Sequence, residues 1–252
     1  MAITSKMHHD GVRVVTMDYP PVNALPVEGW FAISNALNEA GADPGTRAVV
    51  LRAEGRGFNA GVDIKEMQAT AGFGAILGAN RGCYLAFKSI YECAVPVIAA
   101  VNGFCLGGGV GLAGSADTII ASDDAYFGVP EVDRGALGAA THLSRLVPAH
   151  LLRTMYYTSR TITAQRLAEL GSVVEVVAVD RLDDAAFALA DEIASKDTRV
   201  VRAAKEALNC IDPIDVVKSY RFEQGFTFEL NLGGVADELR DGFVTTEPSV
   251  DR

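Results

Sequence analysis

The run from 97 to 111, Val-Ile-Ala-Ala-Val-Asn-Gly-Phe-Cys-Leu-Gly-Gly-Gly-Val-Gly, is a short apolar strand followed by a cluster of glycines. An earlier run repeats this order: Ala-Val-Val-Leu at 48–51 precedes Gly-Arg-Gly-Phe-Asn-Ala-Gly-Val-Asp-Ile-Lys at 55–65. Glycine permits positive φ and lets a ligand approach bare amides. Where a helix begins, unpaired N–H groups and the positive end of the helix dipole favour an anion. Two such loops side by side would direct two N–H donors at one developing oxyanion.

Each glycine cluster taken alone could also be no more than a tight turn. Two better-known glycine motifs are not predicted. The second cluster lacks the Gly-x-Gly-x-x-Gly order after a first strand and a well-placed ribose-binding acid, so a dinucleotide site is not expected. No Gly-Lys-Ser/Thr follows either cluster, so a Walker loop is absent from the sequence.

Apolar patterning outward from these loops predicts alternating strands and helices, followed by a helical run. We expect strands at 12–17, 48–51, 97–101, 118–121 and 126–128. The expected helices cover 28–40, 73–92 and a short stretch to 116, then 142–158, 163–170, 181–195, 198–209 and 213–231. Strands alternating with helices before a helical run indicate an α/β core with a helical C-terminal part.

Composition limits the partners and the location. The 252 residues carry a formal net charge of -10, which argues against nucleic acid or an anionic membrane as the main partner. No apolar run reaches the roughly 20 residues that span a bilayer. Four cysteines without a CxxC pair fit neither a disulfide framework nor a zinc site, so we expect buried thiols and no metal. A reducing cytoplasm is the expected location.

Three segments in this order carry a resemblance to a known family. They are Ala-Gly-Val-Asp-Ile-Lys-Glu-Met at 60–67, Ala-Ala-Val-Asn-Gly at 99–103 with the glycines at 107–109, and Phe-Gly-Val-Pro-Glu at 127–131. These segments resemble the signatures of the crotonase (enoyl-CoA hydratase/isomerase) superfamily, and the resemblance extends over nearly the whole chain. The resemblance implies an α/β spiral of ββα units over residues 1–195. It also implies a helical region at 196–252 that mediates assembly into homotrimers or homohexamers.

The same resemblance assigns candidate site residues. The oxyanion hole falls on the N–H groups of Val62 and Gly108. The substrate is an acyl-CoA thioester, so coenzyme A belongs to the substrate and no separate cofactor is expected. The resemblance implies that three segments bind coenzyme A, one of them the loop at Gly108. The first segment contributes Val22, Ala24 and Leu25. The second contributes Ala60, Val62, Asp63, Ile64 and Lys65.

Departures from the family pattern narrow the reaction. Hydratases of the family use two glutamates, and the first would stand at Gly111, which cannot move a proton. The second position is kept as Glu131, our candidate base. His142 stands where members usually have a small residue, and it is a candidate for polarising a ketone or orienting water. Glu131 could instead be a strand-end carboxylate paired with Arg134 or Arg145.

Three stretches resemble one ring-opening branch of the family: 53–63, 128–143 and 223–232. That branch hydrolyses a carbon–carbon bond of a bicyclic methyl-dioxo-hexahydroindene-carboxyl-CoA in steroid degradation. Water would add to a ring ketone, and the electrons of the broken bond would reach the thioester oxygen as an enolate. The lone Glu131 also fits an enoyl-CoA isomerase. A CoA-ester binder without turnover and a hydratase with an unusual acyl chain are further alternatives. On the helix at 73–92, Phe73, Tyr84 and Tyr91 could line an apolar pocket, although core packing is the simpler role.

Overall fold

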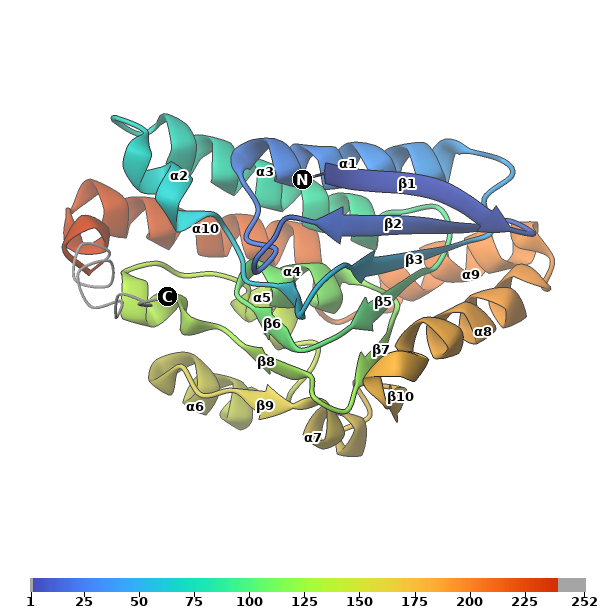
Figure 1. Cartoon of the computed structure of the whole chain (residues 1–252). Helices are drawn as coiled ribbons and strands as arrows, with labels where there is room; N and C mark the ends of the chain where they lie inside the picture. The colour runs from blue at the N-terminus through green and yellow to red at the C-terminus, as the bar shows by residue number, and fades with distance from the viewer. Residues whose placement is uncertain (1, 240–252) are drawn as a thin grey trace, which may run out of the picture.

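A computed structural model describes residues 2–239, in which helices wrap two β-sheets (Figure 1). The larger sheet has the strand order β1-β2-β3-β5-β7-β10, and only β1 and β2 pair antiparallel. Its strands are β1 (Ala2–His9), β2 (Val12–Asp18), β3 (Ala48–Ala53), β5 (Val97–Val101), β7 (Thr118–Ser122) and β10 (Glu175–Val177). The smaller sheet has the order β4-β6-β8-β9, with strands β4 (Gly57–Asn59), β6 (Phe104–Leu106), β8 (Tyr126–Gly128) and β9 (Ile162–Thr163).

Pairs of consecutive strands link the two sheets. β3, β5 and β7 lie in the larger sheet, and each is followed by a short strand, β4, β6 or β8, in the smaller one. Helical segments then return the chain for the next turn. They are α1 (Val27–Ala42), α2 (Ile64–Ala69), α3 (Gly74–Tyr91), α4 (Gly108–Ser115) and the 3-10 helix η1 (Pro130–Arg134). The predicted spiral of ββα units is confirmed.

The remaining helices form the C-terminal part of the chain. They are α5 (Ala140–Leu143), α6 (Ala149–Thr158), α7 (Ala164–Glu169), η2 (Val179–Arg181), α8 (Leu182–Ala194), α9 (Thr198–Ile211) and α10 (Val216–Leu232). α10 packs against α3 and α5, so this helix lies over the core rather than apart from it. The division of the chain at residue 195 stays a prediction, and residues 240–252 of its second part lie outside the described residues.

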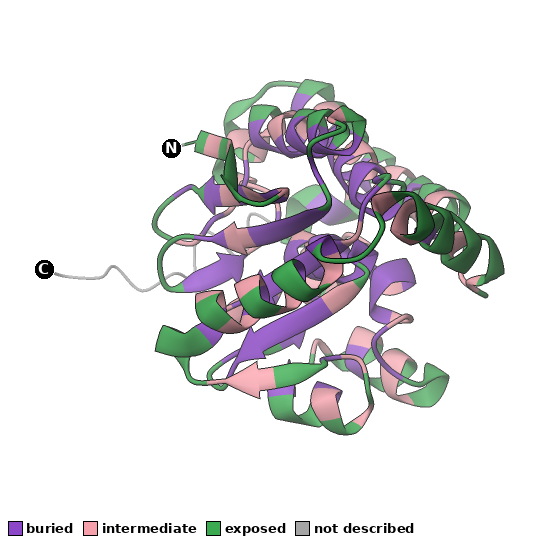
Figure 2. Cartoon of the chain, turned by 90° about the vertical axis from the view of Figure 1, so that its right-hand side faces the viewer, coloured by how far each residue is buried: buried purple, intermediate pink, exposed green. Residues whose placement is uncertain are grey.

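Both faces of the central strands β3, β5 and β7 are buried, which explains their continuous apolar sequences. Along β3, Val49 and Leu51 join the main core, whereas Ala48 and Val50 face α8. Figure 2 shows the buried strands enclosed by helices whose outer faces are exposed. Because β3 and β5 are parallel neighbours, their C-terminal ends lie at the same edge of the sheet, and the two glycine loops begin there.

Three sequence predictions need correction. The single helix expected at 142–158 is two helices, because Pro148 stands just before α6, and Pro favours the first turn of a helix but not its interior. No strand was predicted before residue 12, because the residues of β1 are mostly exposed and polar and show no regular apolar alternation. Cys210 is exposed, whereas the other three cysteines are buried as expected.

In the described range, residues 2–239, no helix has the length and apolar character needed to cross a bilayer. The same residues contain no group of three His, Cys, Asp or Glu side chains placed to hold a metal ion.

Candidate active site

The two glycine loops meet at the backbones of Gly61 and Gly108. A methyl group at Gly61 would lie 3.4 Å from the Gly108 nitrogen, and one at Gly108 would lie 2.5 Å from the Trp30 ring. Gly61 has φ +89° and Gly107 has φ +56°, conformations in which a side chain is strained. Glycine at these positions therefore allows two loops from different turns of the spiral to come into contact.

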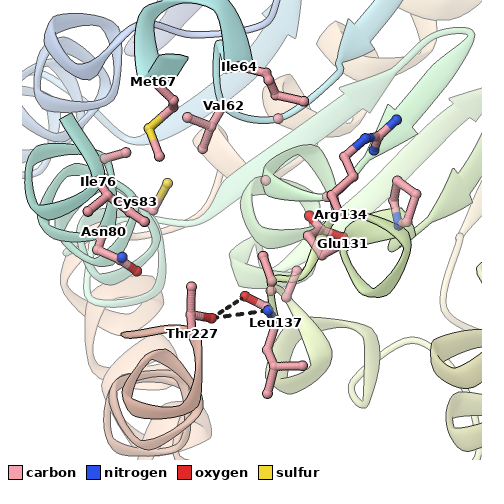
Figure 3. Close-up of a pocket in the computed structure, with 18 of the residues that line it drawn as sticks. Val62, Ile64, Met67, Ile76, Asn80, Cys83, Glu131, Arg134, Leu137 and Thr227 are labelled. Carbon is pink, nitrogen blue, oxygen red and sulfur yellow. Dashed lines mark hydrogen bonds between the residues drawn. The ribbon is translucent and has the colours of Figure 1, made fainter. Parts of the chain in front are cut away.

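Two backbone N–H groups at this contact have no acceptor within residues 2–239. Leu25 accepts from the Asp63 N–H and donates to the Gly61 oxygen, both at 2.9 Å, so the Val62 N–H between them is left out of the pairing. Gly108 is the first residue of α4, where an N–H has no partner inside the helix. Both residues line one pocket (Figure 3).

The pocket lies between these loops and three further walls. Figure 3 shows Val62 on the loop wall, Asn80 and Cys83 on α3, and Glu131 with Arg134 on the opposite side. Segment 136–139 and α10 complete the lining. The exposed lining area is mainly apolar, so a carboxylate in it is poorly solvated.

Glu131 is the carboxylate of this pocket, and glycines make the space for it. A methyl group at Gly107 would lie 2.1 Å from Glu131 Oε1, and one at Gly138 would lie 3.1 Å from its Cγ. Its Oε2 is buried and has no hydrogen-bond partner in the described part of the chain. Burial raises the pKa of Glu131 to about 8, helped by repulsion from Glu223 and opposed by Arg134.

Phe87 occupies the space in front of Gly111. A methyl group at Gly111 would lie 2.1 Å from the Phe87 Cζ atom, so a glutamate cannot be accommodated there without moving the ring. Phe87 lines the pocket from α3, and its ring packs edge-on against Tyr220 of α10 with centroids 5.0 Å apart. The pocket therefore has an aromatic wall at the position where a hydratase would carry its first carboxylate.

His142 lies behind that aromatic wall. It is fully buried, and its ring contacts Phe87 and Tyr220 with centroid distances of 4.6 and 5.0 Å. Neither ring nitrogen has a hydrogen-bond partner among the described residues, and His142 does not contribute to the pocket lining. Burial, with repulsion from Arg145, lowers the pKa of His142 to about 3, so the ring is neutral. The structure thus gives the predicted catalytic histidine no contact with the pocket.

The residues expected to bind coenzyme A are only partly brought together. Ala60, Val62, Ile64 and Gly108 line the pocket. Leu25 is joined to the loop by backbone pairing, and the Asp63 carboxylate caps α2 by accepting from the Lys65 and Glu66 N–H groups. Val22, Ala24, Leu25, Asp63 and Lys65 are absent from the pocket lining, and Lys65 is exposed. Their role in binding coenzyme A stays a prediction.

Several lining residues were missed by sequence reasoning. On α3 the lining side chains are Ile76, Ala79, Asn80, Cys83 and Phe87. Their spacing of three and four residues marks one helix face, a signal present in the sequence. Phe73, Tyr84 and Tyr91 do not line the pocket, and Phe73 is 53% exposed. Thr227 and Asn231 of α10 also line it, from a helix far along the chain.

Comparisons with known proteins identify two relatives that are similar over nearly the whole chain. The chain is 65% identical over 246 residues to the (7aS)-7a-methyl-1,5-dioxo-2,3,5,6,7,7a-hexahydro-1H-indene-carboxyl-CoA hydrolase of Rhodococcus jostii RHA1, covering 98% of this chain and 95% of that protein. It is 66% identical over 244 residues to the enzyme of the same name from Mycobacterium tuberculosis H37Rv, covering 97% and 99%.

Solved structures show the same fold at lower identity. An enoyl-CoA hydratase/isomerase from Xanthobacter autotrophicus Py2 superimposes with a TM-score of 0.85 at 29% identity, covering 99% of each chain. A probable enoyl-CoA hydratase from Mycobacterium thermoresistibile gives 0.84 at 28% identity, covering 93% of this chain and 96% of that one. The profile of the enoyl-CoA hydratase/isomerase family matches residues 7–223. The chain therefore belongs to the enoyl-CoA hydratase/isomerase family, with the crotonase fold.

Proposed function

We propose that the protein hydrolyses a ring carbon–carbon bond of a (7aS)-7a-methyl-1,5-dioxo-hexahydroindene-carboxyl-CoA, in steroid ring degradation. The observation that carries this proposal is the combination of Glu131, the one carboxylate lining the pocket among residues 2–239, with Phe87 filling the place of a hydratase's first carboxylate. The two relatives at 65% and 66% identity bear the name of this activity. A two-glutamate hydration has no support in such a pocket.

The reaction begins with water at a ring ketone. Glu131 accepts a proton from the water as its oxygen bonds to the ketone carbon. The adjacent ring bond then breaks, and its electron pair moves through the enone to the thioester oxygen. The former ketone carbon becomes a carboxylic acid, which releases its proton to solvent as a carboxylate, and the proton on Glu131 passes to the carbon end of the enolate. Water is the only co-reactant, and no electrons are gained or lost overall.

The developing enolate oxygen needs donors that are already in place. In the proposal, the unpaired N–H groups of Val62 and Gly108 both bind this oxygen. Preorganised donors of this kind act without reorganising during the reaction, and losing one typically costs about 2.7–4 kcal/mol of transition-state stabilisation. Both donors come from backbone, so their position is fixed by the loop contact at Gly61 rather than by a rotamer.

Glu131 is suited to carry a proton in both directions. A carboxyl group with a pKa of about 8 is close to the pH of the reaction, so neither its protonation nor its ionisation is costly. Because the base form is the ionised one, activity should rise as the pH increases towards 8. His142, being neutral and enclosed, has no acid–base step in this proposal.

Assembly and location complete the proposal. The exposed apolar side chains Val200, Leu208 and Ile211 of α9 are 66%, 61% and 75% exposed, and Phe222 of α10 is 73% exposed. Surfaces of this kind are commonly covered by a partner. We place them at the contacts of a homotrimer, or of a homohexamer built from two trimers. We place the enzyme in the cytoplasm, a reducing compartment in which its four cysteines remain free thiols.

Isotopic water tests the proposed reaction. With the bicyclic CoA thioester in ¹⁸O-labelled water, mass spectrometry should show one heavy oxygen in the new carboxylate of a ring-opened product. Crotonyl-CoA should not be hydrated in a parallel assay. A product of unchanged mass with a moved double bond would instead support the isomerase, which Glu131 alone could serve. Binding without any product would support a CoA-ester binder.

A further inference from the structure

The helix α10 holds the segment that packs on Glu131. We propose that Glu223 and Thr227 are positioning residues that fix segment 137–141, and through it the Glu131 carboxylate, in the geometry needed for catalysis. The inference rests on the proposed function, in which Glu131 is the base. Glu223 and Thr227 come from the stretch 223–232, which the sequence singled out and the mechanism has not yet used.

Both oxygens of Glu223 are occupied by this segment. Oε1 accepts from the Ala140 N–H at 2.9 Å, and Oε2 accepts from the N–H and the hydroxyl of Thr141, each at 3.0 Å. The Tyr156 hydroxyl donates to Oε1 at 3.3 Å and accepts from the Gly138 N–H at 3.1 Å. Hydrogen bonds to a charged acceptor are stronger than neutral ones, so Glu223 is the centre of this network.

Thr227 holds the other end of the segment. Its hydroxyl accepts from the Leu137 N–H at 3.1 Å and donates to the Leu137 oxygen at 2.8 Å, the pair of bonds drawn in Figure 3. Thr227 lies one helical turn after Glu223, so both side chains project from the same face of α10. The backbone N–H groups of four residues in 137–141 are therefore satisfied by side chains of α6 and α10.

The segment would not keep its shape unaided. Ala139 has φ +58°, a left-handed conformation that a residue with a side chain rarely adopts. Such a residue persists only where its surroundings over-determine it. The hydrogen bonds from side chains of α6 and α10 hold the backbone on both sides of Ala139. These bonds keep Ala139 in its left-handed conformation.

The shape of this segment determines the space around Glu131. A methyl group at Gly138 would lie 3.3 Å from both Cδ and Oε1 of Glu131, and the Ala136 N–H donates to the backbone carbonyl oxygen of Glu131 at 3.1 Å. A shift of the segment would therefore move the wall against which the carboxylate rests. Misplacement of reacting groups by about 1 Å can cost roughly 100-fold in rate.

Charge links the same residues. Glu223 raises the pKa of Glu131 by repulsion, in addition to the larger effect of burial. The other titratable groups that face Glu131 come from η1, α3, α6 and α10, and they are Arg134, Cys83, Tyr156 and Tyr220. Burial raises the pKa of Cys83, Tyr156 and Tyr220, so these three are neutral near pH 7. Among these neighbours, Glu223 is the acid whose removal changes the charge facing Glu131.

The test compares two charge-neutralising variants on one helix. Glu223→Gln keeps the size of the side chain but loses the charge and part of the network. Glu229→Gln removes the same charge from an exposed position of α10 and is the matched control. For ring opening, we expect Glu223→Gln to lower kcat by about 10–100-fold, with a smaller change in KM. The rise of kcat on the acid side of the pH profile should move to lower pH, because the pKa of Glu131 falls when the repulsion from Glu223 is removed. Glu229→Gln should keep the wild-type kcat and the wild-type pH profile.

Variants of Thr227 test the positioning of the segment without changing any charge. Thr227→Val should lower kcat without shifting the pH profile. Thr227→Ser, which keeps the hydroxyl, should retain a kcat close to that of wild type. Wild-type kinetics in both Glu223→Gln and Thr227→Val would overturn the proposal, as would equal shifts in Glu223→Gln and Glu229→Gln. Should Glu223→Gln not fold by circular dichroism, the Thr227 pair decides alone.

The design also separates this inference from the proposed function. If the wild-type protein opens no ring, the proposed function fails. The positioning of Glu131 is then measured directly, from the carboxyl infrared band of Glu131 identified by its absence in Glu131→Gln. A pH titration of that band should show a lower midpoint in Glu223→Gln than in Glu229→Gln. An unchanged midpoint would sink the inference in that case too.

Discussion

Glu131 and His142 lie on the same connecting segment, are both enclosed by protein, and have opposite relations to the pocket. Each carries a polar atom without a partner in the described residues. Glu131 lines the pocket, whereas His142 is sealed behind the rings of Phe87 and Tyr220. Burial shifts both pKa values towards the neutral form, up to about 8 for Glu131 and down to about 3 for His142. The two residues differ in their contact with the cavity, because burial shifts both pKa values strongly, and this contact makes Glu131 rather than His142 the candidate proton carrier.

The largest effect should follow from removing the carboxylate of Glu131. We expect Glu131→Gln to lower kcat for ring opening by about 10²–10⁴-fold, the usual contribution of a general base. Binding of the CoA thioester, measured by calorimetry, should be retained because the loop backbone is unchanged. Turnover at the wild-type rate in the folded variant would remove Glu131 from the mechanism. The contrast between Glu131 and His142 would then have no catalytic meaning.

Stability against pH should report the same group without any substrate. The carboxyl of Glu131 has a pKa of about 8 in the folded protein, above its ordinary value of 4.5, so ionising it favours the unfolded chain. This penalty is small below pH 4.5 and grows as the pH rises towards 8, where it is on the order of 4 kcal/mol. Urea unfolding should therefore show wild-type stability falling, relative to Glu131→Gln, between pH 5 and pH 8. Parallel curves for the two proteins would contradict the buried ionisable carboxyl.

The aromatic wall between the two groups can be tested at Gly111. Gly111→Ala places a methyl group against the Phe87 ring and should destabilise the fold by about 1–3 kcal/mol, the usual cost of overpacking. Gly225→Ala is the matched control, because nothing lies within 4 Å of a methyl group there and alanine favours the helix. Thermal unfolding should show a lower Tm for Gly111→Ala and an equal or higher one for Gly225→Ala. Equal losses would mean that the space before Gly111 is not tightly filled.

The sequence predicted those parts of the molecule that local chemistry fixes. The glycine loops, the apolar strands and the ββα order follow from residue type and spacing, and the loops do meet at Gly61 and Gly108. The α3 face of the pocket was also within reach, since Asn80, Cys83 and Phe87 repeat at three and four residues. The aromatic residues Phe73, Tyr84 and Tyr91 do not line the pocket, and Phe73 stands just before the first residue of α3.

Other features depend on contacts between residues far apart in the chain. Nothing near His142 in the sequence indicates that Phe87 and Tyr220 will enclose it. The bonds from Glu223 to Ala140 and Thr141 likewise join residues more than 80 positions apart. Such contacts follow from the packing of α10 on the core, which periodicity along one segment does not encode.

The smallest effect on activity should come from His142, and its stability effect should have the opposite pH dependence to that of Glu131. The pKa of His142 is about 3 in the folded protein, below its ordinary value of 6.5, so the unfolded chain binds the proton first as the pH falls. Its contribution is complete above pH 6.5 and is lost as the pH falls, by about 1 kcal/mol at pH 5.5. His142→Leu removes the titrating ring, so the variant should lose less stability than wild type between pH 7 and pH 5. Its kcat near neutral pH should stay close to that of wild type, because the ring does not reach the pocket. A large fall in kcat with an intact fold would show that His142 does take part in the reaction, and the contrast with Glu131 would not hold.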